Sequence, residues 1–145
     1  MLYEVIDDPA GTTPAAVRAS YESALADVVD AVGAATVTAE TGVDRERLDA
    51  LVAGESPAVT VAEAAAILGC SADWPDAETV ELEVRDHIML QMSSAVLDVE
   101  AVETGLRDET DLDARTIQQK IEGRQPMTLD EYAAIHHFVA SENPY

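Results

Sequence analysis

Cysteine, lysine and aromatic residues are all scarce in this chain of 145 residues, and each scarcity narrows the class of protein. The single cysteine, Cys70, excludes an intrachain disulfide and fits a reducing compartment. Aromatic residues make up only 4% of the sequence, whereas hydrophobic residues make up 48%. The core must therefore consist of aliphatic side chains and alanine, which suits closely packed helices. A chain of this length can form one good core or two very small ones.

Basic residues are also few. Eight Lys and Arg residues stand against 29 Asp and Glu residues, which gives a net charge of -21, and Lys120 is the single lysine. The acids are spread along segments of helical hydrophobic periodicity, so they indicate a folded acidic surface instead of a disordered tail. This composition resembles that of proteins from salt-loving archaea, whose concentrated potassium chloride screens charge repulsion.

Several other signals are missing. No apolar run approaches the length of a membrane span, and the acidic segment 1–11 is too short in apolar residues for a signal peptide. The sequence has no Gly-rich phosphate loop and no nucleophile–base signature. We therefore expect a soluble, cytoplasmic protein that is not an enzyme, with no catalytic residues, no cofactor and no small-molecule substrate.

The motif around which the chain is organised lies at residues 38–54, TAETGVDRERLDALVAG. A glycine free to adopt positive φ, Gly42, stands between two short amphipathic segments, which is the spacing of a helix-turn-helix. Residues 55–71 add a proline-containing loop, a Thr-x-x-Glu cap and an Ala/Ile/Leu helix closed by Gly69. Together, residues 37–71 resemble the repressor-type helix-turn-helix family typified by phage repressors. That resemblance implies a DNA-binding regulator.

A second copy of the pattern follows later in the chain. When Gly123 is aligned with Gly54, the prolines of the two segments coincide, and after one deleted residue the Thr-x-x-Glu cap and the Ala/Ile helix coincide as well. The second copy has Asp111 where the first has Gly42, and the turn before it is longer. It is therefore a degenerate helix-turn-helix.

These patterns predict an all-α fold made of two repressor-like helix-turn-helix units linked by a long central helix. The expected domains are a strap at 1–11, a first unit at 12–71, a linker at 72–76, and the long helix with the second unit at 77–145. Helices are expected over residues 14–32, 36–41, 44–53, 61–68, 77–99 and 100–110, the last of them fraying into the acidic loop RDETD.

The helix expected over residues 77–99 has a broad apolar surface, wider than one neighbouring layer should cover. Its apolar residues include Val80, Val84, Ile88, Leu90, Met92, Val96 and Leu97. Either this helix is a strut inside the molecule, or it pairs with a copy of itself. We expect a homodimer, which Met92→Asp should convert to soluble monomer.

The candidate DNA contacts are the Arg, Gln and Lys residues on and beside the two predicted recognition helices. In the second unit these are Arg115, Gln118, Gln119, Lys120 and Arg124, and in the first unit Arg45 and Arg47. Arg and Gln form the bidentate contacts that read guanine and adenine in the major groove. The first unit presents Glu46 and Ala50 at neighbouring reading positions, so we expect duplex DNA to bind through the second unit.

Two alternatives stay open from the sequence. Arg115 and Lys120 can instead form surface ion pairs with Glu122 and Asp113. The helix-turn-helix fold can also serve as the scaffold of a non-enzymatic protein-interaction or oligomerisation module, since fold does not determine function.

The three histidines do not predict a metal site. His136 and His137 are adjacent, so their side chains point about 100° apart on a helix and chelate poorly as a pair. No Cys or other His, including His87, stands at ligand spacing from them. We expect packed or half-exposed roles for these histidines.

The whole chain also resembles a small family of uncharacterised proteins from halophilic archaea. The resemblance is strongest in two stretches, TGVDRERLDALVAGESP and QQKIEGRQPMTLDEYAAIHHF. The function of that family is unknown, so the resemblance implies no activity.

Overall fold

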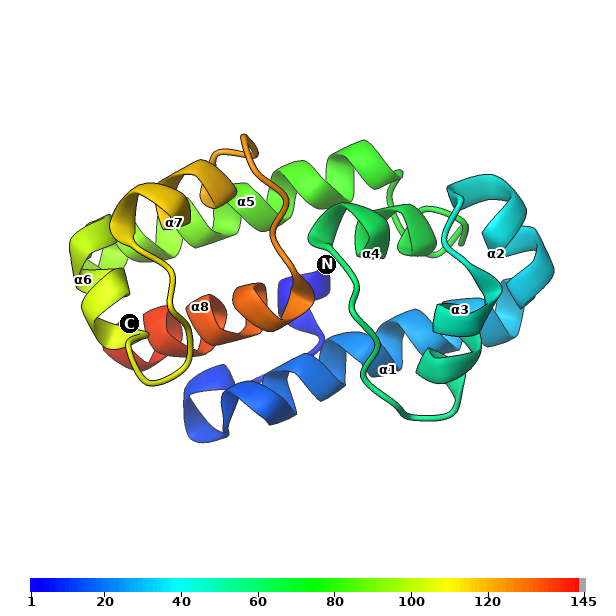
Figure 1. Ribbon diagram of the computed structural model, residues 1–145, viewed down its shortest axis with the longest axis horizontal. Helices are drawn as coiled ribbons and strands as arrows, with labels where there is room; N and C mark the ends of the chain where they lie inside the picture. The colour runs from blue at the N-terminus through cyan, green and yellow to red at the C-terminus, as the bar shows by residue number, and fades with distance from the viewer. Residues whose placement is uncertain (144–145) are drawn as a thin grey trace.

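The computed structural model describes residues 1–143, and the regular elements in that range are helical (Figure 1). The prediction of an all-α fold is confirmed. The second unit was expected to run to Tyr145, and its last two residues lie outside the described range. The elements in chain order are η1 (Leu2–Glu4), η2 (Pro9–Gly11), α1 (Pro14–Val32), α2 (Ala34–Thr41), α3 (Arg45–Val52), α4 (Val61–Leu68), α5 (Ala77–Ala95), α6 (Val99–Gly105), α7 (Ala114–Ile121) and α8 (Leu129–Glu142).

Most of the helices begin at a side-chain cap. In seven of the eight α-helices a Thr or Asp side chain accepts a hydrogen bond from a backbone N–H of the first turn, which would otherwise have no partner. The capping residues are Thr13, Asp44, Thr60, Asp76, Asp98, Asp113 and Thr128. Because these caps are local signals, the expected helix starts lie within two residues of the observed ones.

The helix expected over residues 77–99 is wrong at its C-terminal end, because α5 ends at Ala95. Val96 adopts the left-handed conformation, with φ 55° and ψ 47°, and the N–H of Leu97 donates to the carbonyl of Met92 at 2.9 Å. A separate helix, α6, begins after three residues. The apolar spacing runs through this break, so periodicity did not reveal it, and β-branched residues seldom adopt positive φ.

The helix expected over residues 100–110 is also too long, because α6 ends at Gly105. The chain then turns through the acidic stretch to α7, and the N–H of Thr110 donates to the carbonyl of Leu106 at 2.9 Å. Glycine is a poor helix former, and an ideal Cβ on Gly105 would overlap the ring of Phe138, so α8 packs closely against this position.

One hydrophobic core joins the elements of the described chain. α1 packs along α8 and against α3, while α4 packs along α5 (Figure 1). The rings of Tyr21 and Tyr132 stack at the centre, with centroids 5.0 Å apart. The segment 1–11, expected as a strap, contains the single turns η1 and η2, and its Leu2 is fully buried. Within residues 1–143 no helix combines the length and apolar character needed to cross a membrane.

The apolar surface of α5 divides into a buried and an exposed part. Val80, Val84, Ile88 and Met92 lie in the core. Leu82, Met89, Leu90 and Val96 are instead exposed, by 54%, 43%, 67% and 89%. Because Met92 is a core residue, Met92→Asp would disrupt the fold and cannot serve as the clean monomer-forming change that the sequence suggested.

The loops that precede α4 and α8 pair with each other. Their capping residues, Thr60 and Thr128, form an antiparallel bridge flanked by two backbone hydrogen bonds of 2.7 and 2.9 Å. Each loop follows a glycine with φ of +81°, Gly54 in one case and Gly123 in the other. The segments that align in sequence therefore meet at equivalent places in the structure.

Candidate nucleic-acid interface

The partners of the basic residues separate the candidate DNA contacts into two groups. Five of the eight basic side chains form ion pairs with carboxylates of the same chain. These five are Arg18, Arg45, Arg47, Arg85 and Lys120. Among the described residues, Arg107, Arg115 and Arg124 form no ion pair and no side-chain hydrogen bond, and all three are exposed.

Helix α7 directs the predicted reading residues away from the core. Ile117 and Ile121 are four residues apart, share the inner face, and are 0% and 3% exposed. Arg115 and Gln118 lie outside this face and are exposed. Gln119 is partly exposed, and its side-chain oxygen accepts a hydrogen bond from the amide of Gln125, in the loop after the helix.

Lys120 is held inside the protein. Its Nζ donates to Oε1 of Glu131 and to the carbonyl of Pro126, each at 2.8 Å, and its side chain is 12% exposed. The surface ion pairs considered from the sequence, between Arg115 or Lys120 and Glu122 or Asp113, are absent from the described residues. Lys120 pairs with Glu131 of α8 instead. Arg115 forms no ion pair within the described residues, although its charge contributes to the lowered pKa of Asp113.

Arg47, on α3, is bound in the same way as Lys120, by a glutamate side chain and a backbone carbonyl. Its guanidinium donates to both oxygens of Glu63, at 2.9 and 2.7 Å, and to the carbonyl of Ala58 at 3.0 Å. The hydrogen bonds to Glu63 and to Asp44 raise the pKa of Arg47, and the same guanidinium lowers the pKa of Glu63. Arg45, by contrast, is exposed and pairs only with Asp49, at 3.1 Å between Nε and Oδ1.

The N-terminus of α7 is already satisfied by acids. Oδ1 of Asp113 accepts from the N–H of Thr116 at 2.8 Å, and Oε1 of Glu103 accepts from the N–H of Ala114 at 2.9 Å. The hydrogen bonds from Thr116 lower the pKa of Asp113. A phosphate would meet two carboxylates at this end of the helix, so anion contacts must come from side chains farther along the chain.

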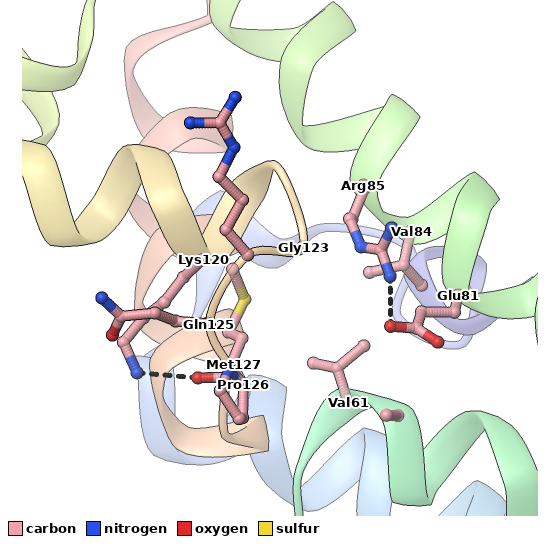
Figure 2. Close-up of a pocket in the computed structure, with 11 residues that line it drawn as sticks. Val61, Glu81, Val84, Arg85, Lys120, Gly123, Gln125, Pro126 and Met127 are labelled. Atoms are coloured by element: carbon pink, nitrogen blue, oxygen red, sulfur yellow. Dashed lines mark hydrogen bonds and ion pairs between the residues drawn. The ribbon is translucent and has the colours of Figure 1, made fainter.

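A pocket of about 220 Å³ lies beside α7, and three basic residues are among those that line it. Figure 2 shows the side chain of Lys120 pointing to the carbonyl of Pro126, away from Arg85. We call this cavity the Arg85 pocket. Arg85 comes from α5, Lys120 from α7 and Arg124 from the following loop, and Glu81 is the single acid in its lining. Arg85 pairs with Glu81, and its guanidinium lies so close to Gly123 that an added Cβ there would stand 2.8 Å from it.

Comparison with known families finds a match over residues 17–142, which span α1 to α8. The chain belongs to DUF5791, a family of unknown function. No curated protein and no solved structure matches this DUF5791 chain.

The sequence did not predict that Arg85 of this DUF5791 chain lies in one pocket with Lys120 and Arg124. It comes 35 residues before Lys120, on a helix predicted only as a strut or dimer contact, and only the tertiary fold brings the two together. Gln125 was missed as the partner of Gln119 for the same kind of reason. A usable signal existed, because Arg85 is the one basic residue of α5 and has acids on both sides.

Proposed function

We propose that this DUF5791 protein binds duplex DNA through α7, as a cytoplasmic regulator adapted to high salt. One observation carries the proposal. The three arginines that form no ion pair within the described residues all lie in the stretch 107–124: Arg107 follows α6, Arg115 is on α7 and Arg124 follows α7. In a chain of net charge -21, unpaired arginines gathered in one stretch are the groups best able to approach a polyanion.

The chemistry of these side chains supports base reading. Arg115 can donate two hydrogen bonds to guanine, and an exposed Gln118 or Gln119 can pair with adenine, each contact worth about 1–3 kcal/mol of discrimination. Arg124 is suited to a phosphate contact, which adds affinity without sequence preference. The proposal gives no DNA contact to Arg47 or Lys120, because both hold carboxylates of their own chain.

High salt reconciles this proposal with the acidic surface. Molar potassium chloride reduces the Debye length to about 3 Å, so repulsion between DNA and distant carboxylates is screened. It also removes most of the counterion-release gain on which basic DNA-binding proteins depend. A binder under those conditions needs few phosphate contacts and relies on direct base contacts, which fits the small number of unpaired arginines.

We further infer that residues 34–68 and 99–142 are two copies of one helix-turn-helix-like unit. Support comes from the paired loops, the two capping boxes closed by Glu63 and Glu131, and the glycines at φ +81°. The units differ at the turn, where three residues connect α2 to α3 and eight connect α6 to α7.

Selection of bound genomic fragments in molar potassium chloride tests the DNA proposal. We expect the wild type to enrich specific sites and Arg115→Ala to lose that enrichment. Arg45→Ala is the matched control, because it removes one exposed arginine from α3 and should leave the enrichment intact. No enriched site for the wild type, or equal losses in both variants, would contradict the assignment.

A second candidate function is self-association through α5, the interaction module considered from the sequence. Four of the five large, exposed hydrophobic residues lie on α5 or directly after it. Their exposed fractions amount to on the order of 400 Å² of surface, within the range of about 300–600 Å² for the largest apolar patch of a typical monomer, which is often functional. A standard interface buries about 800 Å² per partner, and about 65% of a homodimer interface is apolar, so a second copy is the occupant that this area fits.

Light scattering in molar potassium chloride tests this second candidate. We expect the wild type to show twice the chain mass of 15.4 kDa, and Leu90→Glu to show the monomer mass with an unchanged helical spectrum. Val52→Glu is the control, because Val52 is also exposed but lies on α3. A monomeric wild type would refute self-association and would leave the DNA proposal unaffected.

A further inference from the structure

The Arg85 pocket gathers basic residues on a strongly acidic protein. Arg85 and Lys120 pair with Glu81 and Glu131, and Arg124 forms no ion pair within the described residues. Three of the eight basic residues line it, together with one of the 29 acids. The exposed fractions of the Arg85 and Lys120 side chains are 25% and 12%, so their charges are partly withdrawn from water. An anion in the pocket would interact with them more strongly than with surface residues.

Some N–H donors of the pocket's basic side chains make no hydrogen bond within the protein. Arg85 makes one side-chain hydrogen bond, to Glu81, so most of the N–H groups of its guanidinium are uncommitted. Lys120 uses two of its three ammonium hydrogens, on Pro126 and Glu131. Arg124 makes no side-chain hydrogen bond within the described residues and can bring its whole guanidinium to the pocket.

Size and lining restrict the class of ligand. A volume of about 220 Å³ is smaller than the 300–1,000 Å³ of sites for drug-sized molecules, and it equals several water molecules of about 30 Å³ each. Apolar side chains, Val61, Val84 and Met127, form part of its wall (Figure 2). A nucleotide is too large for this space, whereas a phosphate ion or a short dicarboxylate fits it.

We propose that the Arg85 pocket binds a small divalent oxyanion, inorganic phosphate or a short dicarboxylate. Arg85 and Arg124 provide the two guanidinium groups, whose planar N–H pairs match the oxygens of such an ion, while Lys120 stays paired with Glu131. The bound ion ties α5 to the loop that follows α7. The site shares Arg124 with the proposed DNA contacts, whereas Arg85 belongs to the anion site alone, so Arg85→Gln tests this site separately from DNA binding.

Calorimetric titration of the full chain with inorganic phosphate, and separately with malonate, tests the site. The buffer is molar potassium chloride, so that chloride competes and only binding specific for the divalent ion is measured. We expect saturable binding at one site per chain for at least one of the two probes. Arg85→Gln and Arg124→Gln should each weaken it at least about tenfold, since each removes charge-assisted hydrogen bonds.

The controls separate a built site from a general charge effect. Arg107→Gln removes the same charge outside the pocket and should leave the affinity unchanged. Arg124→Gln alters an exposed, unpaired residue, so it stays informative if Arg85→Gln weakens folding. Arg115→Ala should leave anion binding intact even where it abolishes DNA binding, which distinguishes the failure of either proposal. The absence of saturable binding by either probe, or equal losses in Arg107→Gln and Arg85→Gln, would overturn the site.

Discussion

At the scale of single residues, the core contains an ionisable group that stays neutral because of its surroundings. His136 is 5% exposed, and its Nδ1 is hydrogen-bonded to the hydroxyl of Tyr21. The imidazole of His87 lies edge-on to it, with ring centroids 5.3 Å apart. Burial, followed by the proximity of His87 and His137, lowers the pKa of His136 to about 4.

This environment predicts a loss of stability in mild acid. Below pH 6.5 the unfolded chain binds a proton at His136 that the folded chain does not, so the free energy of unfolding falls until the pH reaches the folded pKa of about 4. The loss attributable to this residue approaches about 3 kcal/mol. Urea titrations from pH 7 to pH 4.5 in constant salt should therefore show a smaller decline in His136→Gln than in the wild type. Parallel declines would contradict the assignment.

Val96 is a second residue whose environment predicts a measurable effect. It is 89% exposed and holds φ at 55°, a conformation that costs a β-branched residue about 1–2 kcal/mol. Val96→Gly should therefore raise the free energy of unfolding by about 1 kcal/mol, because glycine adopts this conformation freely. Thermal melts at a protein concentration that keeps the chain monomeric measure the effect. Val52→Gly, in the last turn of α3, should show the opposite sign.

At the scale of elements, a basic residue on α3 and another on α7 each bind the glutamate that closes the capping box of the next helix. Arg47 on α3 binds Glu63 of α4, and Lys120 on α7 binds Glu131 of α8. Each also donates to the carbonyl two residues before the capping Thr. These contacts fix the angle between the helices at both places.

The ion pair between Lys120 and Glu131 predicts that Lys120 contributes to the stability of the fold. Lys120→Met should lower the free energy of unfolding by about 1–2 kcal/mol, because Glu131, 18% exposed, loses a charged partner. The control Arg124→Met removes an unpaired, exposed cation and should change stability by less than about 0.5 kcal/mol. Chemical denaturation of the three proteins makes the comparison. Unchanged stability with uniformly weaker DNA binding would instead identify Lys120 as a phosphate contact.

The same elements show what sequence can and cannot predict. Helix starts were predictable because Thr or Asp caps act within one turn, and α4 was predicted at its observed bounds. The end of α5 was not, because the left-handed turn falls on Val96, a β-branched residue that gives no local stop signal. The roles of Arg47 and Lys120 were also hidden. They occupy different positions in the aligned segments, and only the fold shows that both reach a capping glutamate.

At the scale of the whole molecule, the net charge and the hydrophobic core have opposite effects on the stability of the folded chain. One aliphatic core stabilises the folded chain, while a net charge of -21 on 145 residues opposes compaction. Five of the eight cations neutralise nearby carboxylates, which leaves most of the acids without a counter-charge from the protein. Screening by dissolved ions is then the main means of reducing the repulsion.

We therefore predict that the chain melts at a higher temperature as potassium chloride rises from 0.1 M to molar concentrations, because the Debye length falls from about 10 Å to about 3 Å. Salts also strengthen apolar burial, so a charge-reduced variant is needed to isolate screening. Five exposed carboxylates accept no side-chain hydrogen bond from the described residues and suit this purpose: Asp27, Asp30, Glu46, Glu78 and Asp86.

Replacing all five by their amides should raise the melting temperature at low salt and reduce its rise with salt, since less repulsion is left to screen. Differential scanning calorimetry of both proteins across the salt series gives the two slopes. Equal slopes would attribute the salt effect to apolar burial alone. A flat or falling melting temperature in the wild type would refute adaptation to high salt.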